Sequence, residues 1–273
     1  MVPNVVQHTF RRDTTPTVVA LGRVIKDGRL RFLNISILLL HAGLTALFVT
    51  VPHLLLIRFA LPLTQHSWLY LAIMVFAFVG MVPLVIIAEA KRKMKAVVSG
   101  VVLSLGLSTL LLQWAPCLWA VAFLLWVYFV GFNTLEATLP SLISKLAPVG
   151  YRGTAMGVFS THQFLGSLSG GVGGGWLLQN FSSNGLFLVV GMLYIIWSVV
   201  CVYQPATRHL SIMAFSLPDG DEAMINVFAD HLSNVKGVED MQIFIDERTA
   251  YLKVDKKILD QETLQRLAPK ANL

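Results

Sequence analysis

The stretch Gly131–Gly175, GFNTLEATLPSLISKLAPVGYRGTAMGVFSTHQFLGSLSGGVGGG, joins the end of one apolar segment to a second apolar segment that is rich in glycine. Each segment contains polar side chains. Glu136 lies three residues after Asn133 in the first, and His162 and Gln163 lie side by side in the second. A polar group inside an apolar segment costs free energy unless it has a partner, so these four residues are candidates for a functional site.

The composition is that of an integral membrane protein. Of the 273 residues, 55% are hydrophobic and 13% are charged, which is about half the charged fraction of a soluble domain. The formal net charge is +6, but the basic residues lie beside apolar segments, where they act as topology signals, so we expect no nucleic-acid partner. Cys117 and Cys201 lie in separate apolar segments without metal-ligand spacing, and we expect no metal site and no cofactor.

Six apolar segments are each long enough to cross a hydrocarbon core about 30 Å thick. Before them we expect a cytoplasmic linker over residues 1–32, with a short amphipathic helix near Val18–Arg29 and no signal peptide. Residues 33–203 are then predicted to form a six-helix transmembrane bundle. The expected helices are Leu33–Ile57, Trp68–Ala88, Ala96–Leu112, Pro116–Ile143, Gly153–Leu178 and Leu186–Tyr203.

The connections between these segments alternate in charge. Basic residues precede the first segment, follow the second, and flank the connection after the fourth at Lys145 and Arg152, whereas the opposite connections contain only Arg58. The positive-inside rule therefore places both termini and both basic connections in the cytoplasm. The connection after the second segment is an orientation signal, or it is a charge latch that forms in one conformation. Its charged residues are Glu89, Lys91, Arg92, Lys93 and Lys95.

Residues 204–273 change in character and are predicted to form a small cytosolic domain. Alternating or β-like patterns predict strands at Leu210–Leu217, Val238–Ile245 and Ala250–Val254, and helical spacing predicts helices at Glu222–Val235 and Leu259–Leu267. The order βαββα is typical of a two-layer α+β, ferredoxin-like unit. The loop after its first strand contains no cysteine, so we do not expect it to carry metal.

The polar residues within the apolar segments each have two interpretations. Glu136 and Asn133 share one helix face, and either bind a substrate or proton in a cavity, or form a local structure in which Glu136 bonds to Ser141, a loop backbone or Arg152. His162 and Gln163 either line the same cavity or join two helices through a hydrogen bond. Asn34, His41 and Thr45 fall on one face of the first helix, and the same two interpretations apply to them.

Glycines at every fourth residue mark a helix-packing face. Gly166, Gly170 and Gly174 follow this spacing, and Gly171 and Gly175 form a second register. Small residues at this spacing let two membrane helices approach closely. We therefore expect a partner helix along this face, from this chain or from another.

Long segments of the sequence resemble the C-terminal half of a major facilitator superfamily transporter. The matching segments are AEAKRKMK (88–95), NTLEATLPSLISKLAPVGYRGTAMGVFSTHQFLG (133–166) and the glycines that follow. The resemblance includes a C-terminal cytosolic ferredoxin-like domain of the YAM type and covers essentially the whole chain. It implies two six-helix bundles around a midplane site, with the first, second, fourth and fifth helices here lining that site or the seam. It makes substrate or proton pathway candidates of Asn34, His41, Asn133, Glu136, His162 and Gln163.

The family has twelve helices, whereas this sequence predicts six. A truncated gene product, a separate chain that supplies the N-terminal half, and a pair of identical halves are three explanations, of which we favour truncation. The expected function is transport of an unidentified small solute across a bacterial inner membrane, including proton-coupled efflux. The alternative is a membrane-anchored regulatory or ligand-sensing module that acts through the C-terminal domain. The sequence shows no nucleophile–base pair and no phosphate loop, so we do not expect an enzyme.

Overall fold

A computed structural model describes residues 18–148, 150–205, 210–217, 222–244, 249–255, 258–260 and 263. The chain forms two compact units, which we call the bundle unit and the sheet unit. The bundle unit contains Ile25–Ser144 and Met156–Thr207. The sheet unit contains Met1–Val24, Lys145–Ala155 and Arg208–Leu273.

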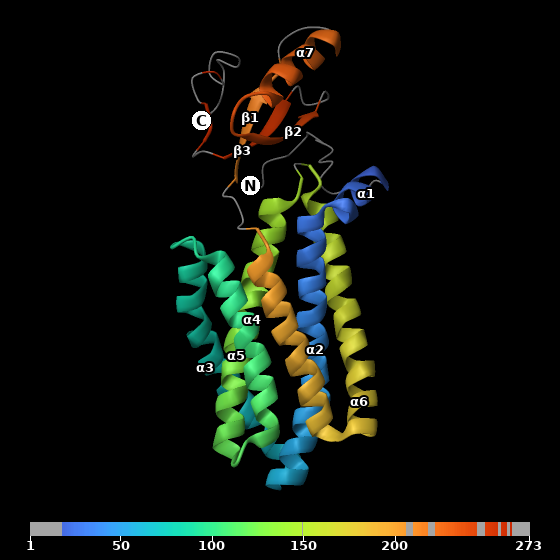
Figure 1. Cartoon of the computed structure of the whole chain (residues 1–273), viewed down its shortest axis with the longest axis vertical. Coiled ribbons are helices and arrows are strands. Elements are labelled where there is room, and N and C mark those ends of the chain that lie inside the picture. The colour runs from blue at the N-terminus through green and yellow to red at the C-terminus, as the bar shows by residue number, and fades with distance from the viewer. Residues whose placement is uncertain are drawn as a thin grey trace, which may run out of the picture. The chain divides into compact units, whose positions relative to one another are not determined.

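Five helices in the described residues are long and apolar enough to cross a membrane. Figure 1 shows their long axes running in nearly the same direction through the bundle unit. The five are α2 (Gly28–Phe59), α3 (Leu63–Glu89), α4 (Met94–Leu111), α5 (Leu118–Leu146) and α6 (Arg152–Tyr203). A short 3₁₀ turn, Leu112–Trp114, extends α4.

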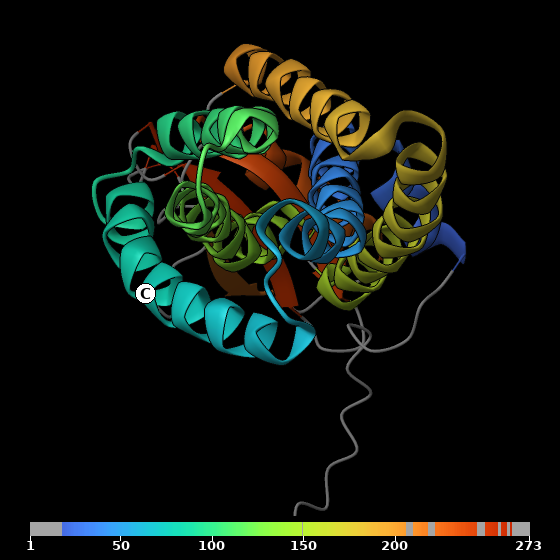
Figure 2. The ribbon, with the colours of Figure 1, turned by 90° about the horizontal axis from the view of Figure 1, so that it is seen from below.

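The last of these helices, α6, consists of two arms separated at Ser182. Ser182 has φ 61° and ψ 178°, whereas the residues on both sides are helical. The chain reverses there, so that the arms 152–181 and 183–203 run in opposite directions (Figures 1 and 2). The sequence predicted a loop between Leu178 and Leu186. The reversal instead takes place at a single residue, and the bundle contains the six predicted helical segments in five continuous helices.

The first spanning helix begins earlier than the hydrophobic pattern predicted. A short helix, α1 (Val18–Lys26), precedes it, and Asp27 separates the two. The Asp27 Oδ1 atom accepts hydrogen bonds from the backbone N–H groups of Arg29 and Leu30 at 2.8 and 3.2 Å. This N-cap satisfies donors that a helix start leaves unpaired. The helix therefore starts at Gly28 rather than at Leu33.

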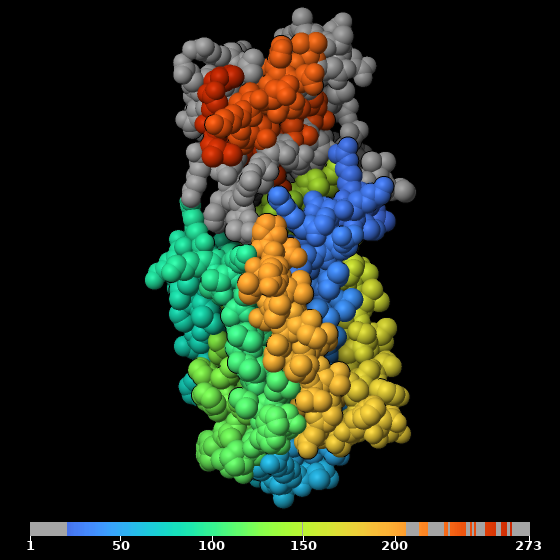
Figure 3. All heavy atoms as spheres, viewed as in Figure 1, coloured from blue at the N-terminus to red at the C-terminus, as the bar shows by residue number. Residues whose placement is uncertain are grey.

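The helix α2 lies against both arms of α6. On one side, a Cβ atom added at Gly174 would lie 2.8 Å from Ala46 Cα, and Cβ atoms added at Gly166 and Gly170 would overlap the main chain of Leu38 and Ala42. The partner of the glycine face is therefore α2 of the same chain. In Figure 3, the second arm of α6 fills the groove between α4 and α2 on the visible face.

The helix α3 is the least buried of the spanning helices. Only 17% of its most apolar window is buried, against 44–50% in the other four. Large apolar side chains such as Trp68, Phe76 and Val79 are exposed along it, and it lies at the rim of the bundle in Figure 2. Apolar exposure on this scale is expected of a surface that faces lipid or another membrane helix.

The sheet unit contains a three-stranded antiparallel sheet in the order β1-β3-β2. The helix α7 (Glu222–Ser233) follows β1 (Leu210–Ser216), and β2 (Val238–Phe244) and β3 (Thr249–Asp255) come next. A core of apolar side chains joins the sheet to α7. Its buried members are Phe215, Leu217, Leu232, Val235, Ala250, Leu252 and Val254.

The order β-α-β-β agrees with the predicted pattern, and each described element lies within two residues of its expected range. The tight turn at Asp246–Arg248 and most of the predicted helix Leu259–Leu267 lie outside the described residues, as does the loop 218–221. The fifth element of the ferredoxin-like pattern therefore stays a prediction. The domain boundaries at residues 32 and 203 stay predictions as well.

Candidate functional site

Three polar side chains from three spanning helices meet inside the bundle unit. His41 lies on α2, Glu136 on α5 and Gln163 on the first arm of α6. The Gln163 Nε2 atom lies 2.9 Å from His41 Nε2 and 3.1 Å from Glu136 Oε1. The His41 Nε2 and Glu136 Oε2 atoms are 3.6 Å apart. We call these three residues the polar cluster.

The surrounding structure holds His41 in one orientation. Its Nδ1 atom lies 3.2 Å from the Ile37 carbonyl oxygen, one turn earlier on α2. The edge of its ring meets Phe132 on α5, with 5.5 Å between ring centroids. The close approach of α2 and α6 at the glycines brings Gln163 within reach of α2. Sequence periodicity thus determines which face of each helix carries the polar group, and the glycines set the distance between helices.

The hydrogen-bond partners define a consistent neutral state of His41. A carbonyl oxygen can only accept, so the Nδ1 atom carries the proton that is donated to Ile37. The Nε2 atom then accepts one hydrogen from the Gln163 amide, whose second hydrogen goes to Glu136 Oε1. With neutral His41 and ionised Glu136, the polar cluster therefore has one negative charge.

One oxygen of Glu136 has no hydrogen-bond partner among the described residues. The side chain is 36% exposed, but the Oε2 atom itself is inaccessible to solvent. An unpaired carboxylate oxygen in an apolar segment is costly. If His41 carried a proton on Nε2, the imidazolium would be a charged partner for this oxygen, 3.6 Å away. The arrangement can therefore hold a protonated His41, or another cation, against Glu136 Oε2.

The other predicted pathway residues lie outside this set of contacts. Asn34 is buried on α2, and its Oδ1 atom has no partner among the described residues. His162 bonds through Nδ1 to the Val158 carbonyl oxygen of its own helix at 2.8 Å. Asn133 is partly buried on α5. The structure thus brings together His41, Glu136 and Gln163, and the hydrogen bonds and ion pair that join them do not include Asn34, Asn133 or His162.

The charged connection after α3 is tied to α5. The Ser141 hydroxyl, which the sequence offered as a partner for Glu136, donates to Glu89 Oε1 at 3.0 Å. Glu89 ends α3, and Arg92 in the following turn has a left-handed φ of 54°. The other basic residues of the connection are Lys91, Lys93 and Lys95, of which Lys93 is the residue before α4.

Sequence reasoning missed a buried tyrosine pair beside the polar cluster. The hydroxyls of Tyr128 on α5 and Tyr194 on α6 are 2.9 Å apart, and Tyr194 donates to the Leu40 carbonyl oxygen at 3.1 Å. Leu40 precedes His41, so the pair joins α5, α6 and α2 next to the cluster. A further bond runs from Trp197 Nε1 to Ser36 Oγ at 3.2 Å. These aromatic residues lie in apolar segments. The sequence alone does not distinguish them from aromatic residues that face lipid.

Comparisons with known proteins agree with this architecture. A sequence model of the family described as Major Facilitator Superfamily matches residues 33–213. The chain is 35% identical over 267 residues to the inner membrane transport protein YajR of Escherichia coli (strain K12), a match that covers 97% of this chain and 58% of that protein. It is 30% identical over 166 residues to the multidrug resistance protein MdtH of Aeromonas hydrophila, covering 60% of this chain and 41% of the relative.

A third match is shorter. An uncharacterized transporter of Buchnera aphidicola is 39% identical over 77 residues, which is 27% of this chain and 20% of that protein. The chain spans little more than half the length of YajR and less of the other two relatives.

Proposed function

The chain belongs to the major facilitator superfamily, and from that premise we propose that it carries a small solute across the inner membrane as one half of a secondary transporter. We propose further that the solute is cationic and is exchanged for a proton. The observation that carries this proposal is the polar cluster, in which Glu136 Oε2 is buried without a hydrogen-bond partner among the described residues. Multidrug resistance and inner membrane transport, named for two relatives, are in line with efflux.

In this proposal, the cationic solute and the protonated His41 side chain compete for one carboxylate oxygen, and this competition exchanges the solute for a proton. When His41 is neutral, the cluster has a charge of −1 and attracts a cation to Glu136 Oε2. When His41 binds a proton at Nε2, the imidazolium needs an acceptor, and Gln163 can no longer donate to it. The nearest carboxylate oxygen is Glu136 Oε2 at 3.6 Å. Formation of this ion pair neutralises the cluster and displaces the cationic solute.

The arrangement of the helices supports a site that opens to one side at a time. The cluster residues come from α2, α5 and α6, and in this family helices of two bundles move against each other around a midplane site. The second bundle is supplied by further sequence, by another chain or by a second copy of this one. We also propose that both termini are cytoplasmic, because the basic connections lie on one side, and that residues 204–273 form a ferredoxin-like domain, which the strand order β1-β3-β2 supports.

Dye efflux tests this proposal. Membrane vesicles that contain the chain, alone or with a six-helix partner, would be loaded with ethidium, a cationic probe, and energised with a proton gradient. We expect Glu136→Gln to abolish the proton-driven flux. The matched control is Asp230→Asn, which removes an exposed carboxylate of α7 and should leave the flux unchanged. Equal flux in the wild type and Glu136→Gln would remove Glu136 from the mechanism.

A second candidate function is a membrane-anchored regulatory module that senses a ligand or partner through the sheet unit. The observation that favours it is that α7 and the sheet bury an apolar core of their own. If no assembly of the chain carries solute, this second function is favoured over transport.

A further inference from the structure

We infer that the face of the sheet turned away from α7 is a docking surface for the connection between α5 and α6, and that Lys253 holds that connection in place. All the residues in this contact belong to the sheet unit, which includes Lys145–Ala155 together with the strands. The docking itself is independent of the transported solute.

The position of Lys253 on the sheet follows from the alternation of β3. Ala250, Leu252 and Val254 are fully buried in the core that faces α7. Successive side chains of a strand point to opposite faces, so Tyr251 and Lys253 lie on the other face. β3 is the central strand, paired with β1 and β2 on its two sides. Lys253 therefore stands in the middle of the second face of the sheet.

A lysine in the middle of an open sheet face would be expected to extend into water. Lys253 is instead only 3% exposed, and its Nζ atom donates a hydrogen bond to the Ala147 carbonyl oxygen at 2.6 Å. Ala147 is itself 4% exposed. The connection therefore contacts this face of the sheet at Lys253, and both residues of the contact are shielded from solvent.

The acceptor lies where an ammonium group is favoured. The helix α5 ends at Leu146, so Ala147 is the first residue beyond it. The last carbonyl groups of a helix lack intrahelical partners and carry partial negative charge, which attracts cations. Lys253 thus caps the cytoplasmic end that we propose for α5. The charge–carbonyl bond offsets part of the cost of taking the ammonium group out of water.

A second contact holds the same connection from the N-terminal side. The guanidinium carbon of Arg23 on α1 lies 5.8 Å from the centre of the Tyr151 ring, a cation–π contact. Tyr151 is the residue before α6. The connection is therefore bound at Ala147 by β3 and at Tyr151 by α1.

The docked connection joins α5, which carries Glu136, to α6, which carries Gln163. With the connection docked, the ends of α5 and α6 are held at a fixed separation. Release from Lys253 would free those ends of the two helices to move.

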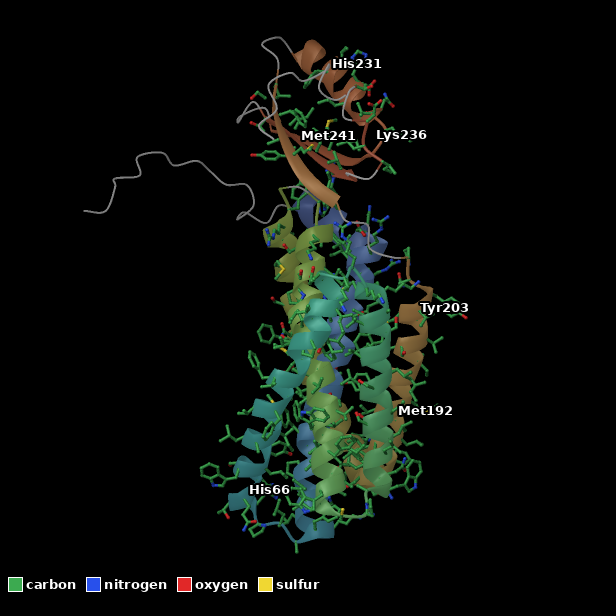
Figure 4. All side chains as sticks on the ribbon, turned by 90° about the vertical axis from the view of Figure 1, so that its left-hand side faces the viewer. His66, Met192, Tyr203, His231, Lys236 and Met241 are labelled. Carbon is green, nitrogen blue, oxygen red and sulfur yellow. The ribbon has the colours of Figure 1, made fainter. Side chains whose placement is uncertain are left out.

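Lysine acetylation of the intact protein tests the docking. The wild-type chain in detergent would be treated with an amine-acylating reagent, and the modified lysines located by mass spectrometry. We expect Lys253 to react at least about tenfold more slowly than Lys236, which is exposed in the same unit (Figure 4), because Lys253 reacts only when the contact opens. Equal rates for the two lysines would overturn the proposal.

A substitution on the opposite partner shows what protects the lysine. Ala147→Trp places a large side chain in the buried contact without altering the sheet. We expect it to raise the acetylation rate of Lys253 toward that of Lys236, while hydrogen exchange in β1–β3 stays slow. If Lys253 stays protected in Ala147→Trp with the sheet intact, the sheet alone buries the lysine and the docking surface is refuted.

A second variant separates docking from folding. Lys253→Met removes the ammonium group that donates to Ala147 and keeps a long apolar side chain on the face opposite the core. We therefore expect amide exchange in residues 145–155 to accelerate by about tenfold while the strands keep their protection. Lys236→Met is the control and should change neither. Unchanged exchange in 145–155 with a folded sheet would contradict the role of Lys253.

Discussion

The hydroxyl group of Tyr194 occupies the space that a side chain at Gly43 would need. A Cβ atom built at Gly43 overlaps the Tyr194 hydroxyl and lies 2.9 Å from its Cε2 atom. The same hydroxyl donates to the Leu40 carbonyl oxygen on α2. The second arm of α6 thus packs closely against α2 through Tyr194, within one turn of His41. The polar cluster owes its geometry to this fit and to the glycine face on the other side of α2.

We predict that Gly43→Ala destabilises the bundle by about 1–3 kcal/mol, the usual cost of overpacking a buried site. The added methyl group must displace an aromatic ring that is fully buried. Thermal unfolding in detergent measures the effect. Gly100→Ala in α4 is the control, because no atom lies within 4 Å of its added Cβ. Equal melting temperatures of the two variants would contradict the fit.

We predict that Tyr194→Phe destabilises the protein by about 1 kcal/mol, since two hydrogen bonds are lost. It leaves the Tyr128 hydroxyl without its partner. The matched control is Tyr70→Phe, because the Tyr70 hydroxyl is buried without a hydrogen-bond partner among the described residues. That variant should be neutral or stabilising. The prediction fails if both substitutions shift the melting temperature in the same direction and by the same amount.

The two glycine registers of α6 should respond differently to substitution. Gly170→Ala places a methyl group against the Ala42 main chain and the Thr45 hydroxyl, and should force α6 away from α2. A Cβ at Gly171 meets no atom within 4 Å. We expect Gly170→Ala to lower thermal stability and the flux of the transporting assembly, whereas Gly171→Ala, with its better helix propensity, preserves stability. Intact function in Gly170→Ala would show that close α2–α6 packing is dispensable.

The reversal within α6 should be stabilised by glycine. Ser182 has φ 61° and ψ 178°, a region that is essentially restricted to glycine and costs other residues about 1–3 kcal/mol. Ser182→Gly should therefore raise the free energy of unfolding by about 1 kcal/mol. Ser183→Gly, one residue along in helical geometry, should lower it, and chemical denaturation of both variants compares the two signs.

The sequence predicted the membrane bundle, its six helical segments and three residues that meet in the polar cluster, because polar atoms stand out within apolar segments. It could not predict which of them meet. Asn133 shares a helix face with Glu136, but partners in a membrane bundle come from neighbouring helices, and Gln163 and His41 reach Glu136 through the α2–α6 packing.

Other features give no local signal. Tyr128 and Tyr194 are indistinguishable in sequence from aromatic residues that face lipid. Lys253 follows the alternation of a strand with one solvated face, and only the fold shows that its ammonium group bonds to the α5–α6 connection. Ser182 lies in a run of polar residues typical of a loop, so the pattern indicated a turn without showing that one residue makes it.

The most direct test of the proposed exchange is proton release on solute binding. The purified transporting assembly would be placed in unbuffered detergent solution and mixed with ethidium while the pH is recorded. If protonated His41 and the cation compete for Glu136 Oε2, each bound ethidium should release up to about one proton. His41→Gln should still bind the dye and release none. Ethidium binding without proton release in the wild type would contradict the account.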